Sequence, residues 1–318
     1  MLEYSNTVPF KQAMDLLKTA IPSAKVSASQ AQRLVQHFGN LPEMEDLLQS
    51  PGFSLSKEEE VEAPILYIQA DGGHLLTDED YKETKVGRLF AGHHIKQVSS
   101  DNQEVNLRNE LEHSDYIAHL GSCDEFIPRL NPLIDNHLAQ ASDTQIVVIS
   151  DGASWIANWI KRDYPKATLI LDFYHAKEKL CEFAAMVFKS KNQRNKWIEN
   201  RTQDLLDGNV NKVILAIRTK ALTRNKSIKE KADNIITYYS NNTYRMQYQL
   251  YQKKGYCIGS GAIESAISTV VQQRCKLVGQ RWTHRVKAVL NLRAAFKSNK
   301  RKEIRTLINS QMGYNSAA

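Results

Sequence analysis

The pattern of apolar and polar positions changes near residue 64. Before it lie two amphipathic stretches with helical spacing, residues 10–20 and 30–38, separated by Pro22. They predict a small helical N-terminal region over residues 1–62. Two short helices around a turn are compatible with a helix-turn-helix remnant, and a simple packing module is the alternative.

After residue 64, short apolar runs predict buried strands and longer amphipathic runs predict helices. The expected strands cover about residues 65–70, 83–92, 93–99, 146–149 and 167–171. The expected helices cover about residues 108–121, 124–140 and a short stretch around Trp155 and Trp159. Three strands followed by alternating helices and strands predict an α/β fold, with a mixed sheet flanked by helices. This is also the strand order of the ribonuclease H-like fold.

The pattern after residue 175 predicts that a helical segment interrupts the α/β core. Residues 176–255 are polar and almost entirely helical in pattern, which predicts an all-helical insertion. We therefore expect a catalytic-type core made of residues 63–175 and 256–300, followed by a C-terminal tail at 301–318.

Composition is that of a globular protein: 42% of the 318 residues are hydrophobic and 24% are charged. No apolar run is long enough to span a membrane, and no secretory signal is visible, so we expect a cytoplasmic protein with no membrane partner. The four cysteines show no paired spacing, which argues against a disulfide framework or a zinc knuckle.

The formal charge of +7 is concentrated near the C-terminus. Between Gln272 and Arg305 stand eleven lysines and arginines against a single acid, Glu303. Such a segment suits contact with a phosphate backbone, and a solvated basic helix is the alternative. The residues expected to contact DNA are Arg274, Lys276, Arg281, Trp282, Arg285 and Arg293. For Trp282, packing in the core is the competing interpretation.

Two aspartates, Asp71 and Asp151, each follow a predicted buried strand and precede a glycine. Sites in open α/β sheets form beyond the carboxyl ends of strands, so both are candidate site residues. Carboxylate oxygens suit hard cations such as magnesium or manganese. A common Asp-Gly turn would explain either residue alone.

Glu264 stands in the first turn of a predicted helix that Ser260 can cap. It lies at the edge of an apolar helical sector, where it could reach the rim of the sheet. Gly259 and Gly261 would let the backbone approach closely. A surface charge that complements the helix dipole is the alternative.

Several spaced motifs resemble those of the ISKra-type insertion-sequence transposases, bacterial relatives of the Mutator-like DDE transposases. The motifs are Ala70-Asp-Gly72, Val148-Ile-Ser-Asp-Gly-Ala-Ser-Trp-Ile156, Leu169-Ile-Leu-Asp-Phe-Tyr-His-Ala176, Gly259-Ser-Gly-Ala-Ile-Glu264, Val271-Gln-Gln-Arg-Cys-Lys-Leu-Val-Gly-Gln-Arg-Trp282 and Leu290-Asn-Leu-Arg-Ala294. They occur in the family's order and span about residues 64–296.

The resemblance implies a ribonuclease H-like core in which Asp71, Asp151 and Glu264 bind two Mg²⁺ or Mn²⁺ ions. It implies cleavage of DNA at the element's ends and transfer of the freed 3′-hydroxyl into target DNA. The implied partners are the terminal repeats, target DNA and further copies of the chain on DNA, in contact with the nucleoid. Asp172 and His175 match an auxiliary Asp-x-x-His pair, for which a helix N-cap with a neighbouring histidine is the alternative.

The N-terminal region is shorter than the family's usual end-recognition region. Two alternatives to an active transposase therefore stay open. One is a truncated, non-enzymatic DNA-binding remnant, and the other is a ribonuclease H-like nuclease without strand transfer.

Overall fold

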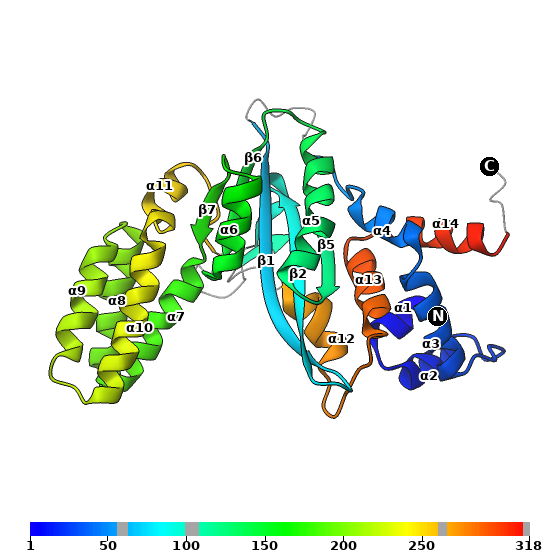
Figure 1. The fold of residues 1–318 in the computed structure, drawn as a ribbon, viewed down its shortest axis with the longest axis horizontal. Coiled ribbons are helices and arrows are strands. Elements are labelled where there is room, and N and C mark those ends of the chain that lie inside the picture. The colour runs from blue at the N-terminus through cyan, green and yellow to red at the C-terminus, as the bar shows by residue number, and fades with distance from the viewer. Residues whose placement is uncertain (56–62, 99–107, 260–265, 314–318) are drawn as a thin grey trace. The chain divides into compact units, whose positions relative to one another are not determined.

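The computed structural model describes residues 1–55, 63–98, 108–259 and 266–313 (Figure 1). Its central element is a five-stranded sheet with the order β5-β2-β1-β6-β7. The strands are β1 (Ile65–Leu76), β2 (Tyr81–Ala91), β5 (Asp115–Leu120), β6 (Gln145–Ser150) and β7 (Thr168–Leu171). The pairs β1–β2 and β2–β5 are antiparallel, whereas β6–β7 is parallel, so the sheet is mixed. The predicted α/β fold class is confirmed.

Helices make up most of the remaining described chain. In order they are α1 (Leu2–Thr7), α2 (Phe10–Ala20), α3 (Ala28–Gly39), α4 (Pro42–Gln49), η1 (Gly92–His94), α5 (Cys123–Leu138), α6 (Ser154–Asp163), α7 (Phe173–Val187), α8 (Lys191–Leu206), α9 (Val210–Ala221), α10 (Lys226–Asn242), η2 (Thr243–Arg245), α11 (Tyr248–Lys253), η3 (Ser268–Gln272), α12 (Gln273–Cys275), α13 (Val286–Lys297) and α14 (Arg301–Gln311). None of the described helices is long and apolar enough to cross a membrane.

Two sequence predictions about the strands were wrong. Residues 93–99 do not add a third strand to the main sheet: they form η1 and β3 (Ile95–Val98), which pairs only with β4 (Arg108–Leu111) in a two-stranded ribbon. The third strand of the main sheet is β5, inside the stretch predicted to be helical. Tyr116, Ile117 and Ala118 are all buried there. A short apolar run without alternation does not distinguish a buried strand from a helix, which explains the error.

The chain divides into two compact units, Met1–Ile146 with Ile263–Ala318, and Val147–Ala262. In the first unit, α13 packs against β5, α1, α3 and α4, so the N-terminal helices share a core with the C-terminal segment (Figure 1). The α2–α3 connection spans residues 21–27, longer than the three or four residues of a helix-turn-helix turn.

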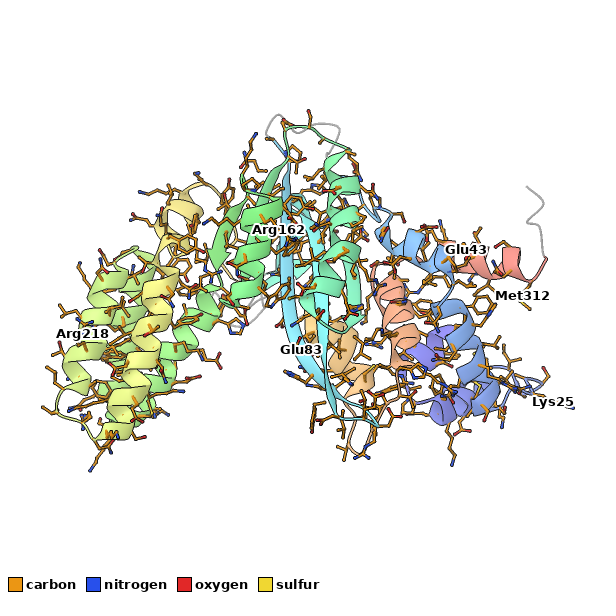
Figure 2. All side chains as sticks on the ribbon, in the orientation of Figure 1. Lys25, Glu43, Glu83, Arg162, Arg218 and Met312 are labelled. Atoms are coloured by element: carbon orange, nitrogen blue, oxygen red, sulfur yellow. The ribbon has the colours of Figure 1, made fainter. Side chains whose placement is uncertain are left out.

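In the second unit, α7, α8, α9 and α10 pack against one another as a helical bundle (Figure 1). Its apolar positions, such as Leu180, Val213 and Ile235, are buried, and polar residues such as Arg218 face solvent (Figure 2). The helical character predicted for residues 176–255 is therefore confirmed.

Candidate active site

Asp71 lies inside β1. The sequence predicted that the strand ends at Ala70, but β1 continues to Leu76, and Asp71 pairs with Val86 of β2. Its Oδ1 accepts a hydrogen bond of 2.7 Å from the backbone N–H of Gly72, and the residue is partly exposed. Two glycines after an aspartate suggest a turn, but long pairing with β2 keeps this segment extended.

The helix that follows Glu264 packs against β1 close to Asp71. A Cβ placed on Gly73 would lie 3.3 Å from Cγ1 of the buried Ile267, so the side chain of Ile267 packs directly against the strand there. Both residues belong to the first unit. Glu264 itself, like Ser260 and Gly261, lies outside the described residues. The described part of the predicted apolar sector is buried: Ala266, Ile267, Val270 and Val271.

Asp151 follows β6 directly and is exposed. Its Oδ1 accepts a 2.9 Å hydrogen bond from the N–H of Ala153, which forms an Asx turn leading into α6. Gly152 lies between them and has a φ of +105°, a backbone conformation that residues other than glycine rarely adopt. The Asp-Gly pair is therefore a turn, as its composition suggests, and it holds the carboxylate beyond the end of a buried strand.

Two residues of the helical insertion fix this turn. The hydroxyl of Tyr238 on α10 donates a 3.0 Å hydrogen bond to the backbone carbonyl of Asp151. Burial, and secondarily the nearby charge of Asp151, raises the pKa of Tyr238 well above its usual value, so the phenol stays a donor. The buried Arg245 donates from Nη2 to the carbonyl of Gly152 at 3.1 Å. Tyr238 and Arg245 are far from Asp151 along the chain, so no local sequence pattern could predict that they contact this turn.

Asp172 lies beside Asp151 at the same edge of the sheet. In the parallel β6–β7 pair Ser150 is opposite Leu171, so the two aspartates follow at matching positions. Asp172 is buried, and its Oδ1 accepts from the N–H groups of Tyr174 at 2.8 Å and His175 at 3.2 Å. It is thus the N-cap of α7, which was the alternative interpretation of this pair. His175 is exposed and lies 3.6 Å from Glu178.

Gly259 permits the close approach expected from the sequence, although its neighbour is the start of α7. A Cβ at this position would lie 2.7 Å from Cδ2 of Tyr174 and 3.3 Å from Oδ1 of Asp172. The N–H of Phe173 also donates to the carbonyl of Ile258 at 3.0 Å. Residues 258–259 are therefore held against the N-terminus of α7, within the second unit.

The predicted acids are thus distributed over both units. Asp71 and the helix after Glu264 belong to the first unit, and Asp151 and Asp172 belong to the second. Within the ranges that the structure describes, no group of three His, Cys, Asp or Glu side chains could hold a metal ion. The two predicted ligands within those ranges, Asp71 and Asp151, offer carboxylate oxygens, the donor type that Mg²⁺ and Mn²⁺ prefer.

Two residues expected to contact DNA, Arg274 and Arg293, are buried instead. Nε of Arg274 donates to the carbonyl of Ser5 at 3.1 Å. Arg293 donates to the carbonyls of Asn6, Thr269 and Val270, the last at 2.6 Å. Two of these acceptors lie in the π-helical stretch η3. Both arginines connect the N-terminus to the C-terminal helices, so we correct their assignment to the core.

Trp282 is also buried, as the core interpretation proposed. Its Nε1 donates to the carbonyl of Cys275 at 3.0 Å, and its ring lies 5.1 Å from the guanidinium carbon of Arg274. Its backbone N–H donates to the carbonyl of Leu76 at 3.1 Å, which fixes the segment before α13 to the end of β1. Lys276, Arg281 and Arg285 are exposed and remain candidates for DNA contact.

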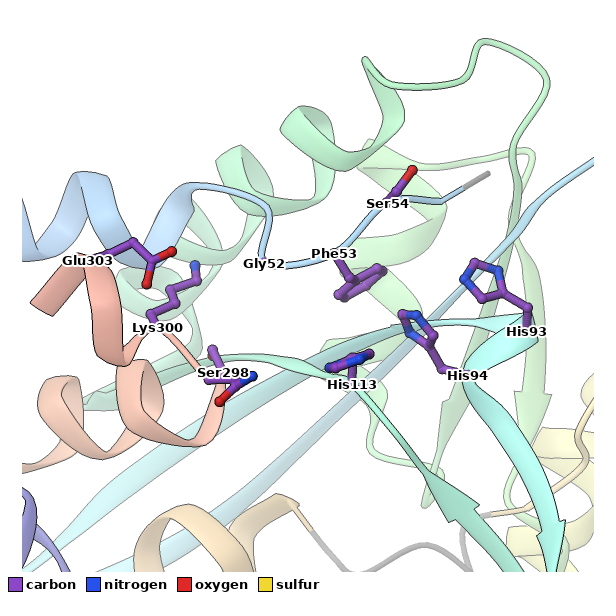
Figure 3. Close-up of a pocket in the computed structure, with 10 residues that line it drawn as sticks. Gly52, Phe53, Ser54, His93, His94, His113, Ser298, Lys300 and Glu303 are labelled. Atoms are coloured by element: carbon purple, nitrogen blue, oxygen red, sulfur yellow. The ribbon is translucent and has the colours of Figure 1, made fainter. Parts of the chain in front are cut away.

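A separate pocket of about 300 Å³ in the first unit contains a cluster of rings that the sequence did not reveal (Figure 3). His94 lies between Phe53 and His113, with ring centroids at 4.9 Å and 5.1 Å. On its other side, Phe53 packs at 4.2 Å against the buried His137. These contacts join Phe53 to η1 and α5.

A buried polar network around Asp115 adjoins this pocket through Gly52 and Lys300, which line it. His137 Nε2 lies 2.8 Å from Oδ2 of Asp115, which also accepts from the N–H of Gly52 at 2.7 Å. The ammonium of Lys300 lies 3.9 Å from Oδ1 of Asp115 and donates to the carbonyls of Leu47 and Ser50. Burial lowers the pKa of Lys300. The network fixes the segment after α4 to β5 and to the start of α14, which is a structural role.

Comparison with known proteins gives one family. The model of an uncharacterised protein family, UPF0236, matches residues 9–307. No curated protein matches the sequence.

Proposed function

Because the chain belongs to the uncharacterised protein family UPF0236, we propose its function from its own residues: it is a metal-dependent DNA transposase. In this proposal Asp71, Asp151 and Glu264 are the catalytic carboxylates. The observation that carries it is the position of the described acids on the sheet. Asp71 is on β1, and Asp151 directly follows the buried strand β6, so each described acid is carried by a strand of the sheet.

Further support comes from the helix that follows Glu264. Its residue Ile267 contacts β1 two residues after Asp71, so the helix runs beside the strand that carries the first acid. The sheet order also places the first three strands on one side of β6 and β7. This is the arrangement expected from the strand order of the ribonuclease H-like fold. A mixed sheet alone occurs with many functions, so the proposal depends on the acids as well as on the fold.

The three carboxylates would hold two Mg²⁺ or Mn²⁺ ions, which activate water and neutralise charge at a phosphodiester. The chain's own contribution to this site is preorganisation. Tyr238 and Arg245 fix the two carbonyls of the Asp151-Gly152 turn, which restricts where the Asp151 carboxylate can point. We expect the enzyme to cut DNA at element ends and to join the freed 3′ ends to target DNA, acting as an oligomer on that DNA.

The test uses labelled terminal-repeat DNA with Mg²⁺ or Mn²⁺. Asp151→Asn is the informative variant, because an asparagine oxygen can still accept from Ala153 and preserve the turn while removing the charge. Asp233→Asn changes an exposed acid of α10 and is the matched control. We expect cleavage and end joining by the wild type and the control, and loss of both by Asp151→Asn by a factor of at least ~100.

The possible outcomes separate the proposal from its alternatives. Equal cleavage by Asp151→Asn and wild type would refute the site. Cleavage without any joining of cut ends to a target plasmid would indicate a nuclease instead. DNA binding with no cleavage in either metal would indicate a non-enzymatic DNA-binding protein.

A further inference from the structure

A polar groove of about 660 Å³ lies in the first unit, between α3 and the start of α13. We call it the α3 groove. Helix α3 contributes Ser29, Gln32, Arg33 and Gln36, which recur at the spacing of one helix face, and Asn40 follows the helix directly. The opposite face of α3, with Ala31, Val35 and Phe38, is buried. The groove is therefore built from the solvent-facing side of an amphipathic helix.

The groove is strongly basic. Its other wall consists of His284, Arg285 and Lys287, and none of the described residues that line it carries a carboxylate. Arg33, Arg285 and Lys287 are exposed, and none of them forms an ion pair with any residue in the described ranges. Helix α3 itself contains no acid. His284 and Lys287 also line a second pocket that contains Asp78, Glu79 and Glu83, whereas Arg33, Arg285 and Lys287 line the α3 groove without a carboxylate among its described lining residues. Three exposed cations around one groove favour a polyanionic ligand.

The wall formed by α3 is rigid. Ser27 and Gln30 form a capping box at its start, with hydrogen bonds of 3.2 Å and 2.8 Å. Nε2 of Gln36 donates to the carbonyl of Arg285 at 2.7 Å, which connects the two walls directly. Near the end of α3, Asn291 of α13 donates to the carbonyl of Gly39 at 2.9 Å. A helix fixed at both ends presents its side chains from a backbone that does not have to be ordered when a ligand binds.

The side chains fit duplex DNA better than an isolated phosphate. Arginine and glutamine make the bidentate contacts that distinguish guanine and adenine in the major groove, which is wide enough to admit a helix. The amides of Gln36 and Asn40 already donate within the protein. Gln32 and Arg33, one turn earlier, have no such hydrogen bond among the described residues.

We propose that the α3 groove binds duplex DNA, with Gln32 and Arg33 directed at base edges and Arg285 and Lys287 at phosphates. The choice of DNA rests on the proposed function, but the proposal requires neither the catalytic acids nor a metal. It gives the chain a sequence-reading helix even though α2 and α3 lack the short turn of a helix-turn-helix.

The first experiment measures affinity of the full chain for a labelled 30-base-pair duplex of mixed sequence, by fluorescence anisotropy over a range of salt concentrations. The double variant Arg285→Ala/Lys287→Ala should flatten the slope of log Kd against log salt by about two, since each phosphate contact contributes about 0.9. Arg218→Ala, an exposed cation on α9, is the matched control and should bind as wild type does. An unchanged slope in the double variant would overturn the proposal, provided that circular dichroism shows it folded.

The second experiment tests base reading. Wild type and Arg33→Ala each select from a pool of duplexes with a randomised 20-base-pair centre. We expect wild type to enrich a motif, and Arg33→Ala to bind that motif about 5- to 150-fold more weakly with relaxed preference at one position. Gln32→Ala should relax a neighbouring position. Identical motifs from all three proteins would overturn base reading, and binding of polyglutamate as tight as of DNA would instead indicate an acidic protein partner.

The catalytic proposal can fail separately. If groove variants lose binding while no form of the protein cleaves DNA, the α3 groove stands and the transposase proposal fails. If wild type cleaves DNA and the groove variants bind it normally, the transposase proposal stands and the α3 groove proposal fails.

Discussion

Replacing Arg293 by methionine should destabilise the protein strongly, because this arginine belongs to the core. Its side chain is 3% exposed and donates to three buried backbone carbonyls, those of Asn6, Thr269 and Val270. Methionine replaces the aliphatic stem but leaves all three acceptors without their charged donor.

The expected loss follows from these three hydrogen bonds. A hydrogen bond to a charged group contributes about 1.5–3 kcal/mol, and leaving a buried acceptor unpaired costs about 1–3 kcal/mol. Part of this is offset because the guanidinium no longer has to be desolvated, a cost that also lowers the pKa of Arg293. We therefore expect a net loss of about 3–5 kcal/mol, a large share of the total stability of a folded domain.

The measurement is urea unfolding followed by circular dichroism, with Arg285→Met as the matched control. Arg285 is exposed, so its replacement should change the free energy of unfolding by no more than about 0.5 kcal/mol. Arg293→Lys should recover little, since one ammonium cannot reach three separated carbonyls. A loss below about 1 kcal/mol in Arg293→Met, together with weaker DNA binding, would show that Arg293 is a surface DNA contact and would refute the reasoning.

Three further results should follow from particular side chains. Gly152→Ala should lower the unfolding midpoint in a thermal scan by several degrees, because its φ of +105° is strained for alanine and a Cβ would lie 2.9 Å from Cε2 of Tyr238; an unchanged midpoint would contradict this. Stability should fall as the pH drops below about 6.5, because burial first, and then the charge of Arg129, lowers the pKa of His119, so the unfolded chain takes up the proton more readily. His119→Gln should reduce this slope in urea titrations at pH 5 and 8, and an identical slope would contradict the assignment. Finally, Cys275 should resist a thiol reagent at pH 8 until the protein unfolds, because burial raises its pKa to about 11, and rapid labelling of Cys275 in the native protein would show that this part of the core opens.

The sequence by itself determined the features that depend on local pattern. Apolar runs located β1, β2, β6 and β7, and helical periodicity located α5, α6 and the helical insertion, because side-chain spacing reports directly on which face of an element is buried. It also offered the Asp-Gly turn at Asp151 and the N-cap at Asp172 as alternative interpretations, and the structure shows both. These signals need only neighbouring residues.

Tertiary structure decided what local pattern leaves open. Pairing with β2 extended β1 through Asp71-Gly72-Gly73, and burial in the sheet made a strand of residues 115–120. Tertiary contacts also decided which cations of the basic C-terminal segment are buried and which are exposed. Long-range contacts with the N-terminal residues drew Arg274 and Arg293 into the core, whereas packing of α3 on α13 left Arg285 on an open groove. Charge alone cannot distinguish these cases, because an arginine is buried only where the fold supplies carbonyl acceptors for its guanidinium.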